Sequence, residues 1–171
     1  MKEITRKAIV IGIIAGLLVL FDGIIARLFK LNASFTWVAF VSWTVFFGAT
    51  TKERLKAIIG YIIGFLLAVA IIKLGTLFSF ISFKVLGVAL ASILATTIIN
   101  FACIELENFE KFFPISISGI FVGIAMTFSG LGIGLGIDTF TNAIVLLSLI
   151  VIYGILGLLS GWATLKYGIK K

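Results

Sequence analysis

The chain has 171 residues, of which 61% are hydrophobic and only 12% are charged, and its mean hydropathy is +1.29. So little charge cannot cover the surface of a soluble domain of this size, and the composition therefore indicates a polytopic membrane protein. The net charge of +7 would suggest a nucleic-acid partner in a soluble chain. Here we assign the cations to the ends of membrane spans, where they set topology, and we expect no nucleic-acid partner.

Histidine is absent, and Cys103 is the one cysteine. A disulfide within the chain is therefore impossible, and any histidine-ligated metal site or histidine-based catalysis is excluded. The glycine-rich run at residues 130–136 lacks the lysine and the strand–helix context of a phosphate-binding loop. We predict that the protein is not an enzyme and that it binds no metal or cofactor.

Six apolar segments account for most of the chain, since a transmembrane helix needs about 20 residues. They leave no room for a soluble domain, so we predict one transmembrane domain over residues 1–171 and an all-α fold. Three spans in each half would make the two halves inverted repeats with short central spans, as in many channels and transporters. The expected spans cover residues 8–29, 33–50, 57–74, 85–104, 114–129 and 142–164.

The first span follows basic residues, as in a signal peptide, but it has no small-x-small cleavage pattern, and we expect it to be retained. It carries Asp22. An acid inside a span is costly and usually functional, so Asp22 is the candidate for ion or proton coupling. The alternative is an interfacial acid paired with Lys30, Lys73 or Lys84.

The second span is rich in aromatic residues, and Phe40, Trp43 and Phe47 share one helix face. The residues that follow, 52–56, are predicted to form a basic loop. In the fourth span, Thr96 and Asn100 lie on one face and are candidates to line a solute path. Hydrogen bonding between helices, worth about 1 kcal/mol or less, is the alternative for these two residues.

The fifth span begins near Pro114, the one proline of the chain, which is tolerated in the first turn of a helix. Glycine, serine and threonine residues recur in this span at steps of three and four, and this spacing places their small side chains on one helix face. The glycine run after residue 130 makes continued helix unfavourable. Such a face most often packs against another helix, and lining a pore is the alternative. The face consists of Ser116, Gly119, Gly123, Thr127 and Gly130.

A pore reading combines these two faces. An aromatic wall on the second span opposite a wall of small and hydroxyl side chains on the fifth would suit a small planar or neutral solute. The sixth span, with Tyr153, Gly157, Ser160 and Thr164 on one face, completes the bundle. Glycine faces on the first, third, fifth and sixth spans exceed the needs of one six-helix bundle, so we also expect a homo-oligomer.

Ten of the 14 lysine and arginine residues lie on the side that holds both termini in this topology. The positive-inside rule therefore predicts cytoplasmic termini.

Two motifs resemble a known family. They are WxxFxSW from Trp37 to Trp43 and, after Pro114, GxFxGxxMTF from Gly119 to Phe128. The chain is similar over nearly its whole length to the small bacterial inner-membrane proteins of the domain of unknown function 1097 family. That resemblance implies a location in the bacterial inner membrane and brings no established activity. The two halves around short central spans also look, more loosely, like the urea-channel and ammonium-channel architecture, although fold does not fix function.

Three functions follow as hypotheses. The first is a channel or facilitator for a small neutral or weakly charged solute in the lipid bilayer. The second is a non-transporting accessory protein that binds other membrane proteins through its glycine faces. The third is a proton-coupled transporter of a small solute that uses Asp22.

Overall fold

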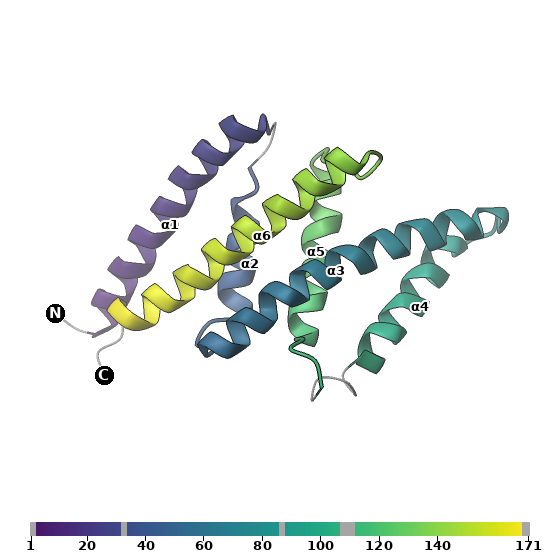
Figure 1. The fold of residues 1–171 in the computed structure, drawn as a ribbon. Helices are drawn as coiled ribbons and strands as arrows, with labels where there is room; N and C mark the ends of the chain where they lie inside the picture. Colours follow the sequence, from purple (N-terminus) through teal and green to yellow (C-terminus); the bar gives the residue numbers. More distant parts are fainter. Residues whose placement is uncertain (1–2, 32–33, 86–87, 107–111, 169–171) are drawn as a thin grey trace.

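The computed structural model describes residues 3–31, 34–85, 88–106 and 112–168, and in these residues the fold is all-α, as predicted (Figure 1). Two strands of two residues each, β1 and β2, pair antiparallel before the fourth helix. A 3-10 turn at Phe78–Phe80 follows the third helix, and a π-helical turn at Thr164–Gly168 follows the sixth. The elements are α1 (Glu3–Phe29), α2 (Thr36–Val45), α3 (Thr51–Leu77), β1 (Lys84–Val85), β2 (Val88–Ala89), α4 (Leu90–Glu105), α5 (Ile117–Gly132) and α6 (Phe140–Ala163).

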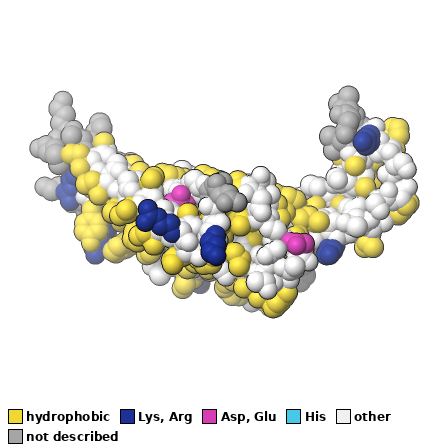
Figure 2. Space-filling model, turned by 90° about the horizontal axis from the view of Figure 1, so that it is seen from above, with side chains coloured by type: hydrophobic (Ala, Val, Ile, Leu, Met, Phe, Trp, Pro, Cys, Tyr) yellow, Lys and Arg dark blue, Asp and Glu magenta, His cyan; other side chains and the backbone are white. Residues whose placement is uncertain are grey.

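Three helices, α1, α3 and α6, are long and apolar enough to cross a membrane. At 1.5 Å per residue, the 27 residues of α3 measure about 40 Å, more than the roughly 30 Å of a bilayer core. The other three are shorter: α2 has 10 residues, and α4 and α5 have 16 each. Large hydrophobic side chains are exposed along α1 and elsewhere, and Figure 2 shows few charged groups on the face it presents. The chain is therefore a multi-pass membrane protein.

Successive helices run in opposite directions, so α1 begins and α6 ends at the same end of the molecule (Figure 1). The closest contacts join a helix of one half to a helix of the other half. α3 packs most closely against α5, and α6 packs most closely against α2. Likewise α1 lies against the turn after α6, and α4 lies against α3. Each short central helix thus packs on the last helix of the other half, which is the arrangement expected of two inverted three-helix halves.

The closing helices of the two halves share a pattern of small residues. Ala57, Gly60 and Gly64 on α3 have the same spacing as Gly154, Gly157 and Gly161 on α6. Each set admits a central helix at short range.

Several helix boundaries differ from the prediction, and the cause is local capping. Residues 52–56 are the first turns of α3 and not a loop, because the Thr50 hydroxyl accepts from the N–H of Glu53 and the Glu53 carboxylate accepts from the N–H of Thr50. This capping box extends the helix into charged sequence. At its other end α3 continues to Leu77, into residues predicted to be a connection.

The start and end of α5 also differ from the prediction. Pro114 precedes the helix, and Ser116 is its N-cap, accepting from the N–H of Gly119 at 3.2 Å. The helix continues through Gly130 to Gly132 before the chain turns at Gly134, whose φ of 92° favours glycine. Gly48, with φ of 86°, makes the corresponding turn between α2 and α3.

Candidate functional site

Asp22 is a buried carboxylate that joins three helices, and its residue is only 8% exposed. Its Oδ1 accepts the N–H of Phe35 at 3.1 Å and the hydroxyl of Tyr153 on α6. Its Oδ2 accepts the hydroxyl of Ser34 at 2.9 Å. Phe35 is the N-cap of α2, where backbone amides have no partner within the helix, so the carboxylate completes the start of that helix.

The lysine partners expected as the alternative for Asp22 are not its partners in the structure. Lys30, Lys73 and Lys84 are all exposed. Within the described residues, Asp22 is held by two hydroxyls and a backbone amide. The ion-pair alternative is therefore wrong, because the carboxylate points toward α2 and α6 and not toward the basic ends of other helices.

A second polar network lies deeper along the same pair of helices. The Ser42 hydroxyl, on α2, donates to the carbonyl oxygen of Gly154 at 2.8 Å and lies 2.6 Å from the hydroxyl of Tyr61 on α3. Ser42 and Tyr61 are both fully buried. Burying these hydroxyls in an apolar bundle would be costly without such partners, so the network is satisfied as it stands.

The two networks are neighbours because they use adjacent residues of α6, Tyr153 and Gly154. On α2 they are separated by seven residues, from Phe35 to Ser42, which corresponds to about 10 Å along a helix. Together they form a row of polar groups along the α2–α6 interface, with exposed Ser34 at one end. Fully buried Val38 and Ala39 lie between the two networks on α2.

The small face of α5 packs against α3 and not against the aromatic face of α2. A methyl group placed on Gly60 would lie 2.8 Å from Cα of Gly119, and one on Gly64 would lie 2.8 Å from Cα of Gly123. One on Gly123 would lie 2.6 Å from the carbonyl oxygen of Tyr61. Backbones this close leave no room for a solute. The face therefore packs against another helix and does not line a pore.

The aromatic face of α2 meets α6. Phe40 and Trp43 stack at 5.8 Å, and a methyl group on Gly157 would lie 2.9 Å from the amide nitrogen of Trp43. Phe47 follows the helix and is 41% exposed. Of the predicted aromatic wall, the Trp43 side chain faces glycine on α6, since a methyl group on Gly161 would lie 3.5 Å from its ring. The predicted pairing of this wall with α5 is wrong, because Gly119 and Gly123 are already covered by α3.

The hydroxyl groups of the α5 face serve the helix itself. Ser116 caps the first turn, as described above. Thr127 is fully buried and donates to the carbonyl oxygen of Gly123 at 2.7 Å, four residues earlier. A hydroxyl bonded to its own helix is not presented to a solute.

Thr96 and Asn100 lie elsewhere in the molecule. They line a shallow groove of about 400 Å³ on α4, and the Asn100 side-chain amide donates to the Thr96 carbonyl oxygen at 2.8 Å. α4 packs chiefly on α3, whereas Asp22 contacts the start of α2 and α6. The groove is therefore apart from the Asp22 site. The structure does not bring these two residues together with the α2–α6 row.

Sequence reasoning missed Ser34 and Tyr61 as parts of the polar networks. A signal existed for Tyr61, since a tyrosine in an apolar helix usually finds a partner for its hydroxyl. Ser34 gave none, because its role depends on the fold-back of α2 onto α1.

No curated protein and no solved structure matches this chain. The looser resemblance to urea and ammonium channels therefore gains no support. The match that exists is to a family described as "Protein of unknown function (DUF1097)", and it covers residues 8–165. Because it spans nearly the whole chain, as the two motifs predicted, the protein belongs to the DUF1097 family.

Proposed function

We propose that the protein is a channel or facilitator for a small neutral or weakly charged solute. The observation that carries this proposal is the row of polar groups along the α2–α6 interface, which runs from exposed Ser34 through buried Asp22 and Tyr153 to buried Ser42 and Tyr61. Polar groups inside a membrane protein commonly mark solute or ion pathways. The hydroxyls of Ser42 and Tyr61 offer exchangeable hydrogen bonds to a small polar solute, which suit passage better than tight binding.

The proposed route replaces the one first expected along α5. In this structure it is closed, because Val38 and Ala39 fill the interface between the two networks. Opening it requires α2 to shift against α6. The shortness of α2 and the glycine turn at Gly48 that follows it support such a movement, since hinges are a few terminal residues that absorb changes in φ and ψ.

The test is solute flux into liposomes that contain the purified protein, measured by stopped-flow swelling over a panel of small neutral solutes. We expect at least one solute to enter faster than into empty liposomes. Asp22→Asn should change that rate, whereas Asp138→Asn should not. Asp138 is the matched control: it is exposed before α6, and the hydrogen bond from Asn142 lowers its pKa, so it stays charged near neutral pH. Swelling no faster than in empty liposomes for every solute would refute the proposal.

Proton coupling through Asp22 is a second candidate, favoured by the burial of a carboxylate within a membrane span. A transporter of this kind needs a pH gradient for accumulation, and a channel does not. If Asp22 couples protons, Asp22→Asn should abolish pH-dependent uptake. Uptake that is unchanged at every pH would remove this role.

An accessory role, in which the protein binds other membrane proteins, and homo-oligomerisation would both use the free glycine face of α1. Methyl groups placed on Gly12, Gly16 or Gly23 would meet nothing within 4 Å, unlike those on Gly60, Gly64, Gly119 and Gly123 of α3 and α5. We propose that this face packs against a second copy of the chain, giving a homo-oligomer. Native mass spectrometry in mild detergents should detect the oligomer and should lose it for Gly16→Leu. Monomer alone in every mild detergent would contradict this proposal.

We also propose that the protein resides in the bacterial inner membrane with both termini in the cytoplasm. The cation bias supports this orientation, and α1 begins and α6 ends at one end of the molecule (Figure 1). A reporter that is active only outside the cytoplasm, fused after Lys171, should give no signal. A strong signal would reverse the orientation.

A further inference from the structure

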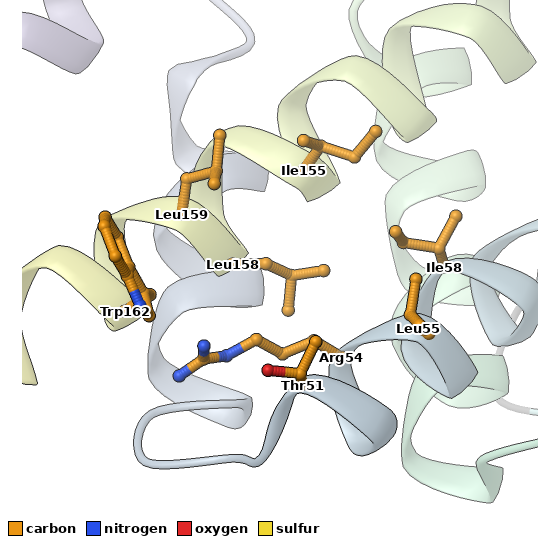
Figure 3. Close-up of a pocket in the computed structure, with 8 residues that line it drawn as sticks. All are labelled: Thr51, Arg54, Leu55, Ile58, Ile155, Leu158, Leu159 and Trp162. Carbon is orange, nitrogen blue, oxygen red and sulfur yellow. The ribbon is translucent and has the colours of Figure 1, made fainter.

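A groove of about 280 Å³ lies between the first turns of α3 and the last turns of α6 (Figure 3). Its walls are apolar along most of their length. Arg54, Thr51 and Trp162 complete the lining. The apolar side chains that form the walls are Leu55, Ile58, Ile155, Leu158 and Leu159.

One end of the groove is polar and positively charged. Figure 3 shows the Arg54 guanidinium and the Thr51 hydroxyl pointing toward the end where Trp162 lies. The ammonium of Lys166 lies over the Trp162 ring, 4.6 Å from its centroid, which adds a second cation at that end. The Nε of Arg54 is shielded from solvent and has no hydrogen-bond partner within the described part of the chain. An arginine held in this way lacks an acceptor for part of its donor set.

The neighbouring charges do not supply that acceptor. Glu53 is exposed, and its carboxylate already accepts the N–H of Thr50 in the capping box at the start of α3. Lys52 and Lys56 lie in the same turns and add positive charge. The apolar walls of the groove therefore lead to a cluster of cations, which lies at the end of the molecule where α1 begins and α6 ends.

From this geometry we infer that the groove binds an anionic phospholipid. The phosphate would meet Arg54, whose planar guanidinium matches phosphate oxygens, with Thr51 and Lys166 beside it. One acyl chain would lie along the apolar walls toward Ile58 and Ile155. A tryptophan beside basic residues is typical of the membrane–water interface, where a headgroup would sit. A free phosphate would use only the charged end, whereas the phospholipid matches both ends of the groove.

The experiment compares two phospholipids with identical dioleoyl chains on the full-length protein in a mild non-ionic detergent. Phosphatidylglycerol carries a net negative charge, and phosphatidylcholine does not. Apparent dissociation constants come from the rise in melting temperature as each lipid is added. We expect phosphatidylglycerol to bind about tenfold more tightly than phosphatidylcholine, because both carry the phosphate but the positive charge of choline is repelled by the cations around Arg54. Equal binding of the two lipids would overturn the inference.

Variants then locate the site. Arg54→Gln should weaken phosphatidylglycerol binding by about tenfold or more, while Lys52→Gln, an exposed cation two residues away, should change it by less than about twofold. Ile155→Trp keeps every charge but fills the apolar end, and it should weaken binding as well. Because Ile155 is 37% exposed, this variant should fold even if Arg54→Gln does not. Unchanged lipid affinity in Ile155→Trp would overturn the inference.

A soluble headgroup separates the lipid from a free anion. Glycerophosphoglycerol has the same phosphate and no acyl chains, and at the same concentration it should not raise the melting temperature. A rise equal to that from the whole lipid would refute the phospholipid assignment and leave a simple anion site.

Discussion

The two principal interfaces of the molecule use the same device in different ways. At the α3–α5 interface, glycines lie on both sides, and Gly60 and Gly64 meet Gly119 and Gly123 backbone to backbone. At the α2–α6 interface, glycine lies on α6 alone. Gly157 meets the α2 backbone, since a methyl group there would overlap the Ala39 carbonyl oxygen, whereas Gly154 and Gly161 face the side chains of Tyr61 and Trp43. The first interface is therefore backbone contact on both sides, and the second combines a backbone contact with hydroxyl and aromatic side chains.

The two interfaces differ in the share of side chains that they hold. The α3–α5 interface is closed by backbone contact, and the α2–α6 interface adds side chains that hydrogen-bond. A closed backbone contact gives rigidity, since nothing in it has an alternative rotamer. An interface that contains side chains can rearrange, and the proposed solute route runs along this one.

The strongest test of this comparison enlarges a glycine on the backbone-to-backbone side. Gly123→Leu forces α3 and α5 apart, and we expect it to lower the free energy of unfolding by about 3 kcal/mol, at the upper end of typical overpacking costs. Gly16→Leu on α1 is the control, because nothing lies within 4 Å of that position in one copy of the chain. Thermal unfolding of the monomeric fraction in detergent measures both. A stable Gly123→Leu protein with lost flux would instead restore the pore along α5.

Removing the carboxylate from the polar side should have the next largest effect. Asp22→Leu leaves the Phe35 amide and the Tyr153 hydroxyl without their acceptor, and a buried unsatisfied donor costs about 1–3 kcal/mol. We expect a loss of about 2 kcal/mol by chemical or thermal unfolding. Asp22→Asn, which keeps one acceptor oxygen, should lose less. Equal stability of Asp22→Leu and wild type would show that α2 does not depend on this carboxylate.

A smaller change sharpens the role of the deeper network. Tyr61→Phe deletes one hydroxyl and leaves the bond from Ser42 to the Gly154 carbonyl intact. We expect a loss of about 1 kcal/mol, the net value of one hydrogen bond. Tyr167→Phe, at a half-exposed tyrosine after α6, is the matched control and should change stability very little. If both variants unfold alike, the Tyr61 hydroxyl has no stabilising role.

The smallest effect is expected at the connection between the two interfaces. Thr50→Ala removes the capping box at the start of α3, which follows α2 after one turn. Because this cap is exposed, the loss should be about 0.5–1 kcal/mol, toward the low end for N-caps. Thr76→Ala is the control: it also has an exposed hydroxyl on α3, but it bonds within the helix. A larger loss in Thr76→Ala than in Thr50→Ala would contradict the capping role.

Composition and hydropathy were enough to predict the all-α fold, because the bilayer constrains length and polarity strongly. The boundaries were less predictable. Charged residues 52–56 gave the impression of a loop, whereas the pairing of Thr50 with Glu53 makes them helical. Capping depends on two side chains in register and is easily overlooked beside a run of charge.

The site was predictable in part. Asp22 stands out as an acid in an apolar span, but its partner Tyr153 lies 131 residues away, beyond the reach of local pattern. The glycine faces were also visible in the sequence. The pairing of these faces could not be predicted, because small residues on one helix allow close approach of any other helix. A single sequence therefore does not show that α5 packs on α3 and α2 packs on α6.

The contact between the start of the chain and its end has a consequence for biosynthesis. α1 is made before the other five helices, yet its main neighbour is Thr164–Gly168, which is made after all of them. Asp22 can accept hydrogen bonds from Ser34 and Phe35 soon after they are synthesised. It can accept the one from Tyr153 only after α6 has been synthesised. Most contacts of α1 with the rest of the molecule therefore form only after α6 has been made. A nascent chain that stops before α6 would expose an incompletely paired acid, a mark by which quality-control proteases could distinguish unfinished copies from complete ones.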